Sequence, residues 1–362
     1  MRHALKHATA GVLASAVVLA LGAGSASAAG KFDGVTLTIG TFGGSWKDRL
    51  CSVFCPKFEA EGGKVEWVSG NPRILLSKMV AARGQEPPMD VIEIVESTPE
   101  TVKGGFVQKY DPANVPNIKH LGASYYDDFK VANWITEEGF IFDIEKFKEL
   151  GLPRPTRYKD LLHPKLAGRV AFPEINVNAA IGGIVGFAAE GGGDENNIDP
   201  GLDLIKKLNV HSFWSAGTQV THMHKAGDVY ATIAHAGWAV RLNDGGVKVG
   251  MVHPPIKDKR GLAGVGFAGV TAGTKNKAAA EFYLNILISD EMQELLHVKN
   301  GIVPPNRNIQ VKYSDPSKLK RDASGVPFLL MKPSEVDNLY NIDWSGFSMK
   351  DWTRKWNRQV AK

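Results

Sequence analysis

The side chains best suited to binding chemistry stand directly after strand-like runs of the sequence. A glycine-rich turn carries Phe42, Ser45 and Trp46, with Ser45 as the expected helix N-cap, and Glu96 and Ser97 follow another such run. Glycines let a backbone approach a ligand, free helix N–H groups donate to it, and a carboxylate suits an ammonium or guanidinium group. Two ordinary interpretations stay open: aromatic rings folded into the core, and a helix-start acid at Glu96.

A second set of candidates lies in the C-terminal half. Glu174 and Asn176 separate a predicted strand from a Gly-rich helix, Trp238 follows a later strand with Arg241 one helical turn onward, and Trp134 lies near a predicted hinge. An indole face stacks on planar ligands or holds a cation, and a guanidinium clamps a carboxylate. Core packing for Trp238 and a solvated helix position for Arg241 are the alternatives. Together these residues indicate a small ligand with an amine, and an acid group as a further option.

Enzymatic patterns are weak in this sequence. Cys51 and Cys55 are the only cysteines, and they fall inside a predicted helix beside apolar residues, whereas a reactive thiolate needs a base or a positive field and exposure. Regular helix geometry strains a bond between residues four apart, but Pro56 distorts the helix, so a disulfide and two buried thiols both stay open. We therefore expect no catalytic residue, no cofactor and no enzyme.

Metal-binding patterns are equally incomplete. Tyr125 and Tyr126 form an adjacent pair, but they precede the predicted hinge. His222 and His224 have no Asp, Glu or Cys beside them to complete a ligand set. We expect no bound metal.

Composition excludes some partners. Hydrophobic residues make up 43% and charged residues 22% of the 362 positions, as in an ordinary globular protein. Removing Arg2 and Lys6 with the leader described next lowers the basic count from 43 to 41, against 38 acidic residues. This near-neutral balance argues against nucleic acid as the main partner.

The first 28 residues have the pattern of a secretory signal peptide. Arg2 and Lys6 precede an apolar run at 11–21, and small residues at 26–28 offer a cleavage site. The apolar run is shorter than the ~20 residues of a membrane-spanning helix. The sequence therefore predicts an exported protein without a lipid anchor, in a compartment such as the periplasm.

The elements that must position these side chains alternate between strand and helix periodicity. Strand-like runs at 35–39, 64–68 and 90–95 enclose helices at 46–58 and from 72, and a second unit follows Pro153–Pro155. This pattern predicts an α/β fold with parallel sheets, whose ligands lie beyond the carboxyl ends of the strands. Two segments link the units, so we expect hinges near 136–141 and 264–270.

Five segments, in order, resemble the landmarks of one known family. They are TIGTFGGSW at 38–46, MDVIEIVEST at 89–98, the crossover at 139–174, GDVYATIAHAGWAVRL at 227–242 and NGIVPPNRN at 300–308. Together they are similar to the family 1 periplasmic solute-binding proteins of ABC importers, and most closely to the polyamine-binding-like branch. The resemblance covers nearly the whole chain after the leader.

That resemblance implies a type II, two-lobed periplasmic-binding-protein fold, each lobe a mostly parallel sheet flanked by helices. It places lobe 1 at 29–137 with 266–308, and lobe 2 at 138–265 with 309–362. It also implies a monomer that closes on a polyamine or amino-acid-like solute and delivers it to an inner-membrane permease and ATPase. The alternatives are a thiaminase-like enzyme on the same fold and a ligand sensor for a receptor.

Overall fold

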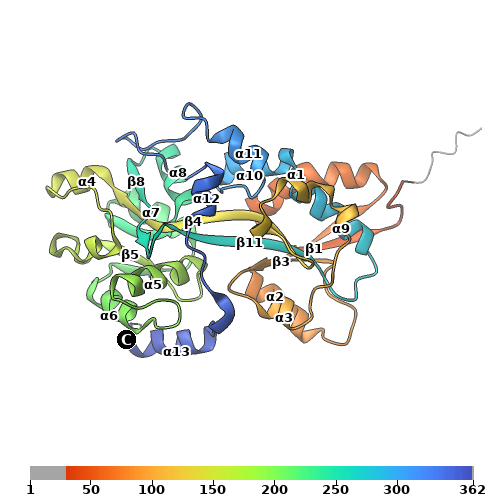
Figure 1. Cartoon of the computed structure of the whole chain (residues 1–362), viewed down its shortest axis with the longest axis horizontal. Helices are drawn as coiled ribbons and strands as arrows, with labels where there is room; N and C mark the ends of the chain where they lie inside the picture. Colours follow the sequence, from red (N-terminus) through yellow and green to blue (C-terminus); the bar gives the residue numbers. More distant parts are fainter. Residues whose placement is uncertain (1–29, 361–362) are drawn as a thin grey trace, which may run out of the picture.

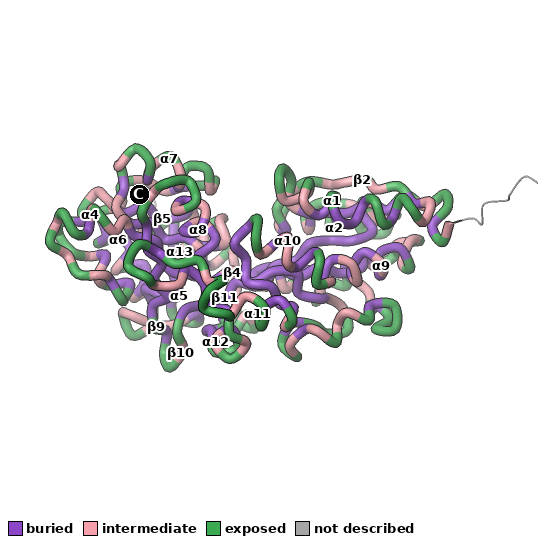
Figure 2. Tube along the Cα trace, turned by 90° about the horizontal axis from the view of Figure 1, so that it is seen from above, coloured by how far each residue is buried: buried purple, intermediate pink, exposed green. Residues whose placement is uncertain are grey.

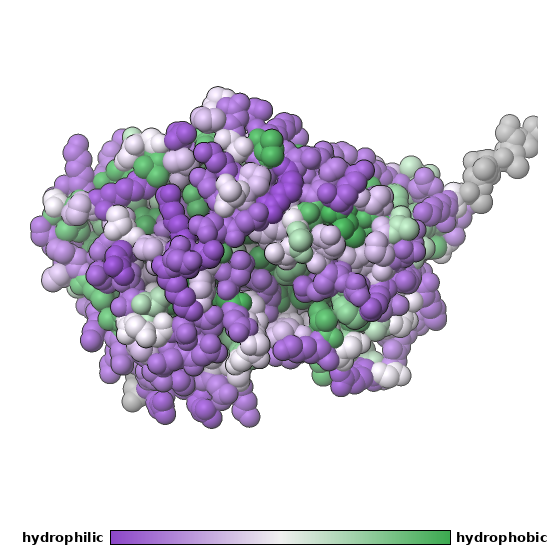
Figure 3. All heavy atoms as spheres, viewed as in Figure 1, coloured by the Kyte–Doolittle hydropathy of each residue, from purple (hydrophilic) through white to green (hydrophobic). Residues whose placement is uncertain are grey.

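The computed structural model of the chain describes residues 30–360 as two lobes joined by long strands (Figure 1). The predicted signal peptide lies outside the described residues. Within this part of the chain, no helix combines the length and apolar character needed to cross a membrane. The surface seen in Figure 3 is mostly hydrophilic, with apolar residues in small separate groups.

One mixed sheet runs through both lobes. In lobe 1 three parallel strands lie in the order β2-β1-β3, and in lobe 2 three more lie in the order β7-β5-β6. The two long strands β11 and β4 stand between these sets and pair antiparallel with each other. The strands are β1 (Thr36–Thr41), β2 (Lys64–Ser69), β3 (Val91–Val95), β4 (Val131–Asp143), β5 (Val170–Pro173), β6 (Ser212–Trp214), β7 (Ala231–His235), β8 (Val249–Val252), β9 (Pro255–Ile256), β10 (Lys259–Arg260) and β11 (Leu262–Val270).

The strand β4 belongs to both lobes. Its first half pairs with β11, and its second half pairs with β7 and β8. Figure 2 shows buried chain continuing along these strands from one lobe into the other. The predicted α/β, two-lobed fold is confirmed, with three parallel strands in each lobe; the strands that join the lobes pair antiparallel, so the sheet as a whole is mixed. The lobe boundaries at 137/138 and 265/266 stay a prediction, because β4 and β11 run through both positions without a break.

Helices cover both faces of the sheet. In lobe 1, α1 packs on α9 and α10, and in lobe 2, α5 packs on α6. The helices are α1 (Ser45–Ala60), α2 (Pro72–Ala81), α3 (Glu100–Lys103), α4 (Ile144–Glu149), α5 (Asn178–Glu190), α6 (Asp199–Lys207), α7 (Gly217–Ala226), α8 (Ala236–Asp244), α9 (Lys277–Leu287), α10 (Asp290–Asn300), α11 (Arg307–Tyr313), α12 (Pro333–Asp337) and α13 (Met349–Gln359).

The start of α1 differs from the expectation. Ser45 is the first residue of the helix, and the N-cap position belongs to Gly44 with φ of 61°, a region that favours glycine. Because Gly44 has no side chain, no side-chain cap satisfies the first turn of α1.

The two cysteines form a disulfide within α1. Cys51 and Cys55 have Cα atoms 4.8 Å apart, and Pro56 follows within the helix. The structure therefore selects the disulfide over two buried thiols. A bonded sulfur cannot act as a thiolate nucleophile, so the oxidised protein lacks the group that a thiaminase-like mechanism would need.

We expect thiol titration to distinguish these two states in solution. The unfolded, unreduced protein should give no reaction with a thiol reagent, and two thiols should appear after reduction. Replacing both cysteines with Ser should leave the fold intact and lower the free energy of unfolding by about 2 kcal/mol, the low end for disulfides, because the closed loop is short. Two thiols in the unreduced, unfolded protein would contradict the disulfide.

Candidate functional site

A cavity of about 750 Å³ lies between the lobes, where the parallel strands of both sets end. Its wall includes residues that follow or end these strands: Phe42 after β1, Asn71 after β2, Ser97 after β3, Asn176 after β5, Ser215 after β6, and His235 at the end of β7. This is the edge at which parallel α/β sheets bind ligands. The alternation of strand and helix periodicity in the sequence predicts this edge as the ligand site.

Five helices begin at this cavity. The first residues of α1, α2, α5 and α7, and the residues around the start of α8, line its wall. Asn71 caps α2 through its side chain, whereas no side-chain cap is present at α1, α5 or α8. Each helix N-terminus carries roughly half a positive charge and unpaired N–H groups. The cavity is therefore prepared to receive an anionic group.

Two arginines add full positive charge to this wall. Arg73 donates from Nη2 to Ser97 Oγ at 3.1 Å, and Arg241 donates from Nη2 to the Asn300 carbonyl at 2.8 Å. Burial lowers the pKa of both guanidinium groups, that of Arg241 to about 10, so both remain protonated at neutral pH. Among residues 30–360, neither forms a salt bridge with a carboxylate. Both cations are therefore free to bind a ligand anion.

Aromatic rings form the remaining walls. Trp46, Trp134, Trp214 and Trp238 line the cavity together with Phe42. The Trp134 indole donates to a carboxylate oxygen of Glu93, a residue 3% exposed, at 2.7 Å, which holds the ring in place. Aromatic walls lower the local dielectric of the cavity, and polar contacts made there are stronger than in water.

Trp238 lies against another residue of the predicted site. The guanidinium of Arg241 lies 4.3 Å from the centre of its ring, and the first residue of α7, Gly217, approaches so closely that a Cβ there would overlap the indole. The indole therefore holds a cation from the protein itself and positions Arg241 for the cavity.

One carboxylate lines the main cavity within the described chain. Glu138, on β4, is 4% exposed, and its Oε1 accepts from Thr136 Oγ1 at 2.7 Å. Its Oε2 is buried and has no hydrogen-bond partner. Burial raises the pKa of Glu138 to about 7, so this group changes charge near neutral pH.

The structure brings most of the predicted binding residues together. Eight of them line the cavity: Phe42, Ser45, Trp46, Ser97, Trp134, Asn176, Trp238 and Arg241. Glu96 instead lines a small adjoining alcove, where its Oε2 accepts from the Val265 N–H at 3.1 Å. Glu174 lines neither space, and its backbone pairs with Trp214 and Val177. Contact of any of these residues with a solute stays a prediction.

Sequence reasoning missed two charged residues of the cavity. Arg73 follows the Asn71–Pro72 helix start, and the same rule that selected Ser45 would have selected it. Glu138 lies inside a predicted hinge strand, and no local pattern marks which strand residues face a cleft.

A metal centre would need several His, Cys, Asp or Glu side chains close together. Within residues 30–360 there is no group of three or more His, Cys, Asp or Glu side chains close enough to hold a metal ion. His224 is 3% exposed and its Nε2 lies 3.0 Å from Thr232 Oγ1.

A two-lobed α/β fold with a polar, aromatic-walled cavity between the lobes defines a class of solute-binding proteins. Three solved structures show the same fold. An ABC transporter protein of Clostridium perfringens has a TM-score of 0.70 and 22% identity over 90% of this chain and 99% of its own. A GABA receptor has a TM-score of 0.71 and 19% identity, over 90% of this chain and 97% of its own. The spermidine/putrescine ABC transporter substrate-binding protein of Streptococcus pneumoniae has a TM-score of 0.69 and 13% identity, over 90% of this chain and 98% of its own.

The family assignment comes from the sequence. Residues 56–323 match the model for bacterial extracellular solute-binding proteins, and no curated protein matches the chain. Because this match covers most of the chain, the protein belongs to that family. The resemblance predicted from five short segments is confirmed.

The position of Trp238 leads to a test of the site. Trp238→Ala removes the ring beneath Arg241, so affinity for the solute that most raises the melting temperature should fall by about 3- to 30-fold, as expected for a cation–π contact of ~0.5–2 kcal/mol. Trp238→Phe keeps a ring face and should lose less. Titration of intrinsic tryptophan fluorescence measures both, since four indoles line the cavity. Unchanged affinity in the Ala variant would remove Trp238 from the site.

Proposed function

We propose that this protein is the periplasmic substrate-binding component of an ABC importer and that it captures a small amino-acid-like solute through a carboxylate group. The observation that supports this most directly is the positive charge at the cavity: Arg73 and Arg241 without salt-bridge partners in the described chain, and three helix N-termini without side-chain caps. A carboxylate binds both kinds of donor through charge-assisted hydrogen bonds.

The charge balance argues against a polyamine. A polyamine carries two or more positive charges at neutral pH and needs a carboxylate for each. Within the described residues the main cavity offers Glu138 alone, and the adjoining alcove adds Glu96 beside it rather than at a second, distant position, against two guanidinium groups in the cavity wall. Solved proteins on this fold include a GABA receptor and a spermidine/putrescine-binding protein, so the fold accepts both solute types and the side chains must choose. Here they favour a solute with an acid group.

Capture and delivery follow from the architecture. A solute between the lobes contacts both at once, so it favours the closed conformation by the difference in its affinity for the closed and open states. A closed, loaded monomer would then dock on a membrane permease and its ATPase. No step of this cycle needs covalent chemistry, and we assign no catalytic role to any residue.

Thermal shift tests the carboxylate requirement. Amino acids and monocarboxylic acids at 100 times their dissociation constant should stabilise the protein by ~2.7 kcal/mol, whereas spermidine and putrescine should not. Arg241→Gln should weaken the best acid at least tenfold, because the variant removes a partly buried charged donor. Arg241→Lys is the matched control. It keeps the charge but loses the planar fork of the guanidinium, so its affinity for the acid should lie between those of the unchanged protein and the Gln variant.

A different result would overturn this proposal. Stabilisation by putrescine or spermidine but by no carboxylate would restore the polyamine interpretation. Circular dichroism of each variant checks that the fold is unchanged.

A further inference from the structure

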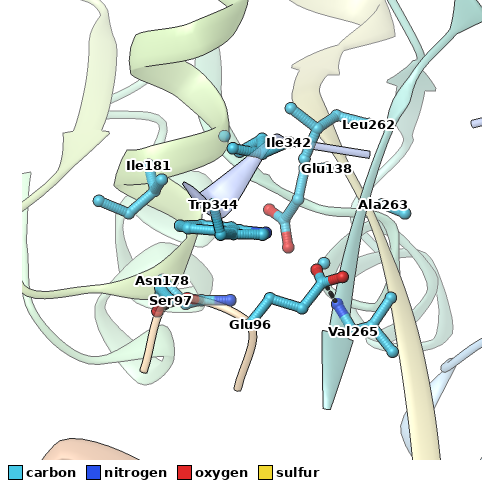
Figure 4. A pocket seen from close by; sticks show the side chains of 12 residues that line it. Glu96, Ser97, Glu138, Asn178, Ile181, Leu262, Ala263, Val265, Ile342 and Trp344 are labelled. Carbon is cyan, nitrogen blue, oxygen red and sulfur yellow. Dashed lines mark hydrogen bonds between the residues drawn. The ribbon is translucent and has the colours of Figure 1, made fainter. Parts of the chain in front are cut away.

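A small alcove opens from the main cavity at the hinge. It is lined by Glu96 of lobe 1, Glu138 of β4, the start of α5, residues of β11, and Trp344 from the C-terminal segment (Figure 4). It shares Ser97, Glu138 and Asn178 with the large cavity, so a solute in the cleft can reach it. Its free space is about 10 Å³, room for one water-sized group.

Both carboxyl groups point into this alcove. Figure 4 shows the side chains of Glu96 and Glu138 converging from opposite sides beside the Trp344 ring. Glu138 Oε2 is buried without a hydrogen-bond partner. Gly182 of α5 permits the approach, since a Cβ there would lie 3.1 Å from Glu138 Cβ. A buried, unpaired carboxylate oxygen costs free energy unless a donor fills the space.

We infer that this alcove receives the ammonium group of the solute between Glu96 and Glu138, which makes the solute an ω-amino acid with its two charged ends held apart. The inference rests on the proposed function, which supplies the carboxylate site. An ammonium group has about the size of a water molecule, donates three hydrogen bonds, and neutralises a carboxylate. A guanidinium or carboxylate group is larger and does not fit.

The two charged ends have separate positions in the structure. The start of α5 and Ser97, which accepts from Arg73, line the alcove, whereas it contains no residue of α1, α7 or α8 and Arg241 lies outside it. The two positions that lie apart are therefore the alcove and the carboxylate site at Arg241. In an α-amino acid the ammonium and carboxylate groups are bonded to one carbon, so they cannot occupy both places. A chain of several carbons between them can extend along the aromatic walls.

Entry of the ammonium group displaces a proton. Burial raises the pKa of Glu96 and of Glu138 to about 7, so below this pH the alcove holds protonated carboxyl groups. An ammonium ion lowers the pKa of its carboxylate partner, the carboxyl O–H bond breaks, and the proton passes to solvent. Affinity for an ω-amino acid therefore rises with pH between 6 and 8, the direction set by a group that must be ionised in the complex.

The other titratable groups around the alcove do not account for a rise in affinity between pH 6 and pH 8. Lys130 and Tyr125 face Glu96, and His235 and Tyr158 face Glu138 from β7 and from the segment before β5. Burial raises the pKa of both tyrosines and lowers that of His235 to about 3, so these three stay neutral from pH 6 to 8. Lys130 forms an ion pair with Asp127 at 2.9 Å.

Calorimetry with matched probes tests the inference on the mature protein. The probes are 4-aminobutanoate and 5-aminopentanoate, with butanoate and pentanoate as analogues that lack the amine. Each amino acid should bind about tenfold more tightly at pH 8 than at pH 6 for each proton released, and titration in buffers of different ionisation enthalpy should count that proton. The analogues should bind without proton release and without this pH dependence.

Variants assign the effect to the alcove. Glu138→Gln keeps the shape and the bond to Thr136, so it should abolish the advantage of the amino acids over their analogues, measured as the ratio of the two affinities. Glu96→Gln should reduce that advantage and provides a second variant if the first does not fold. Glu174→Gln is the matched control, because Glu174 lines neither space.

The outcomes separate this inference from the proposed function. Equal, pH-independent binding of amino acids and analogues would mean that water fills the alcove, which overturns the inference and leaves the carboxylate site intact. Tighter binding of α-amino acids than of both ω-amino acids would also overturn it. Failure of every carboxylate probe would overturn the proposed function, and the inference with it.

Discussion

The pairing of β4 with β11 is the constraint on which the rest of the structure depends. These two antiparallel strands pass from one lobe to the other, and each set of parallel strands attaches to one of them. Because the ladder fixes how the two sets face each other, the carboxyl ends of all six parallel strands open on one cavity. The same ladder carries Trp134, Thr136 and Glu138 on β4, so the hinge itself supplies part of the site.

The electrostatics of the cavity follow from this geometry. Parallel strands connected by helices direct helix N-termini to the strand ends, so a cleft made from two such sets collects positive partial charge from both lobes. The two arginines increase this charge, and Trp238 supports Arg241 at a position where no carboxylate of the described chain neutralises it. Burying unpaired cations is unfavourable in the unliganded protein, and a bound anion removes that cost.

Much of this arrangement could be predicted from the sequence, because alternating periodicities identify the strands and helices, and the strand ends then locate the site. Phe42, Ser45, Trp46, Ser97 and Trp238 were found by this rule, since each stands just after a strand. Their individual roles were harder to predict: the partner of Trp238 is Arg241, a contact that only the packed helix α8 reveals. Glu138 was not predicted as a site residue. It lines the cavity because β4 lies at the boundary between the lobes, and the position of a strand in the sheet is a property of the whole fold. The exclusion of Glu174 from the cavity depends on one local turn, in which its backbone pairs with Trp214 and Val177.

The hinge carries more restraint than two strands alone would give. Both carboxylate oxygens of Glu137 accept from the Leu330 N–H, and Glu137 Oε2 lies 2.5 Å from His253 Nε2, so the C-terminal segment is tied to β4 from a residue next to Glu138. Across the cleft, Ser97 Oγ donates to Asn178 Oδ1 at 3.2 Å, a direct contact between the lobes beside the alcove. A motion that opens the cleft must break this contact while the tie at Glu137 holds. Glu96 and Glu138 are both held at the β4–β11 ladder, Glu96 through the Val265 N–H and Glu138 as a residue of β4. A solute that contacts them therefore contacts the hinge itself as well as the walls of both lobes, and it favours the conformation in which all of these contacts are made.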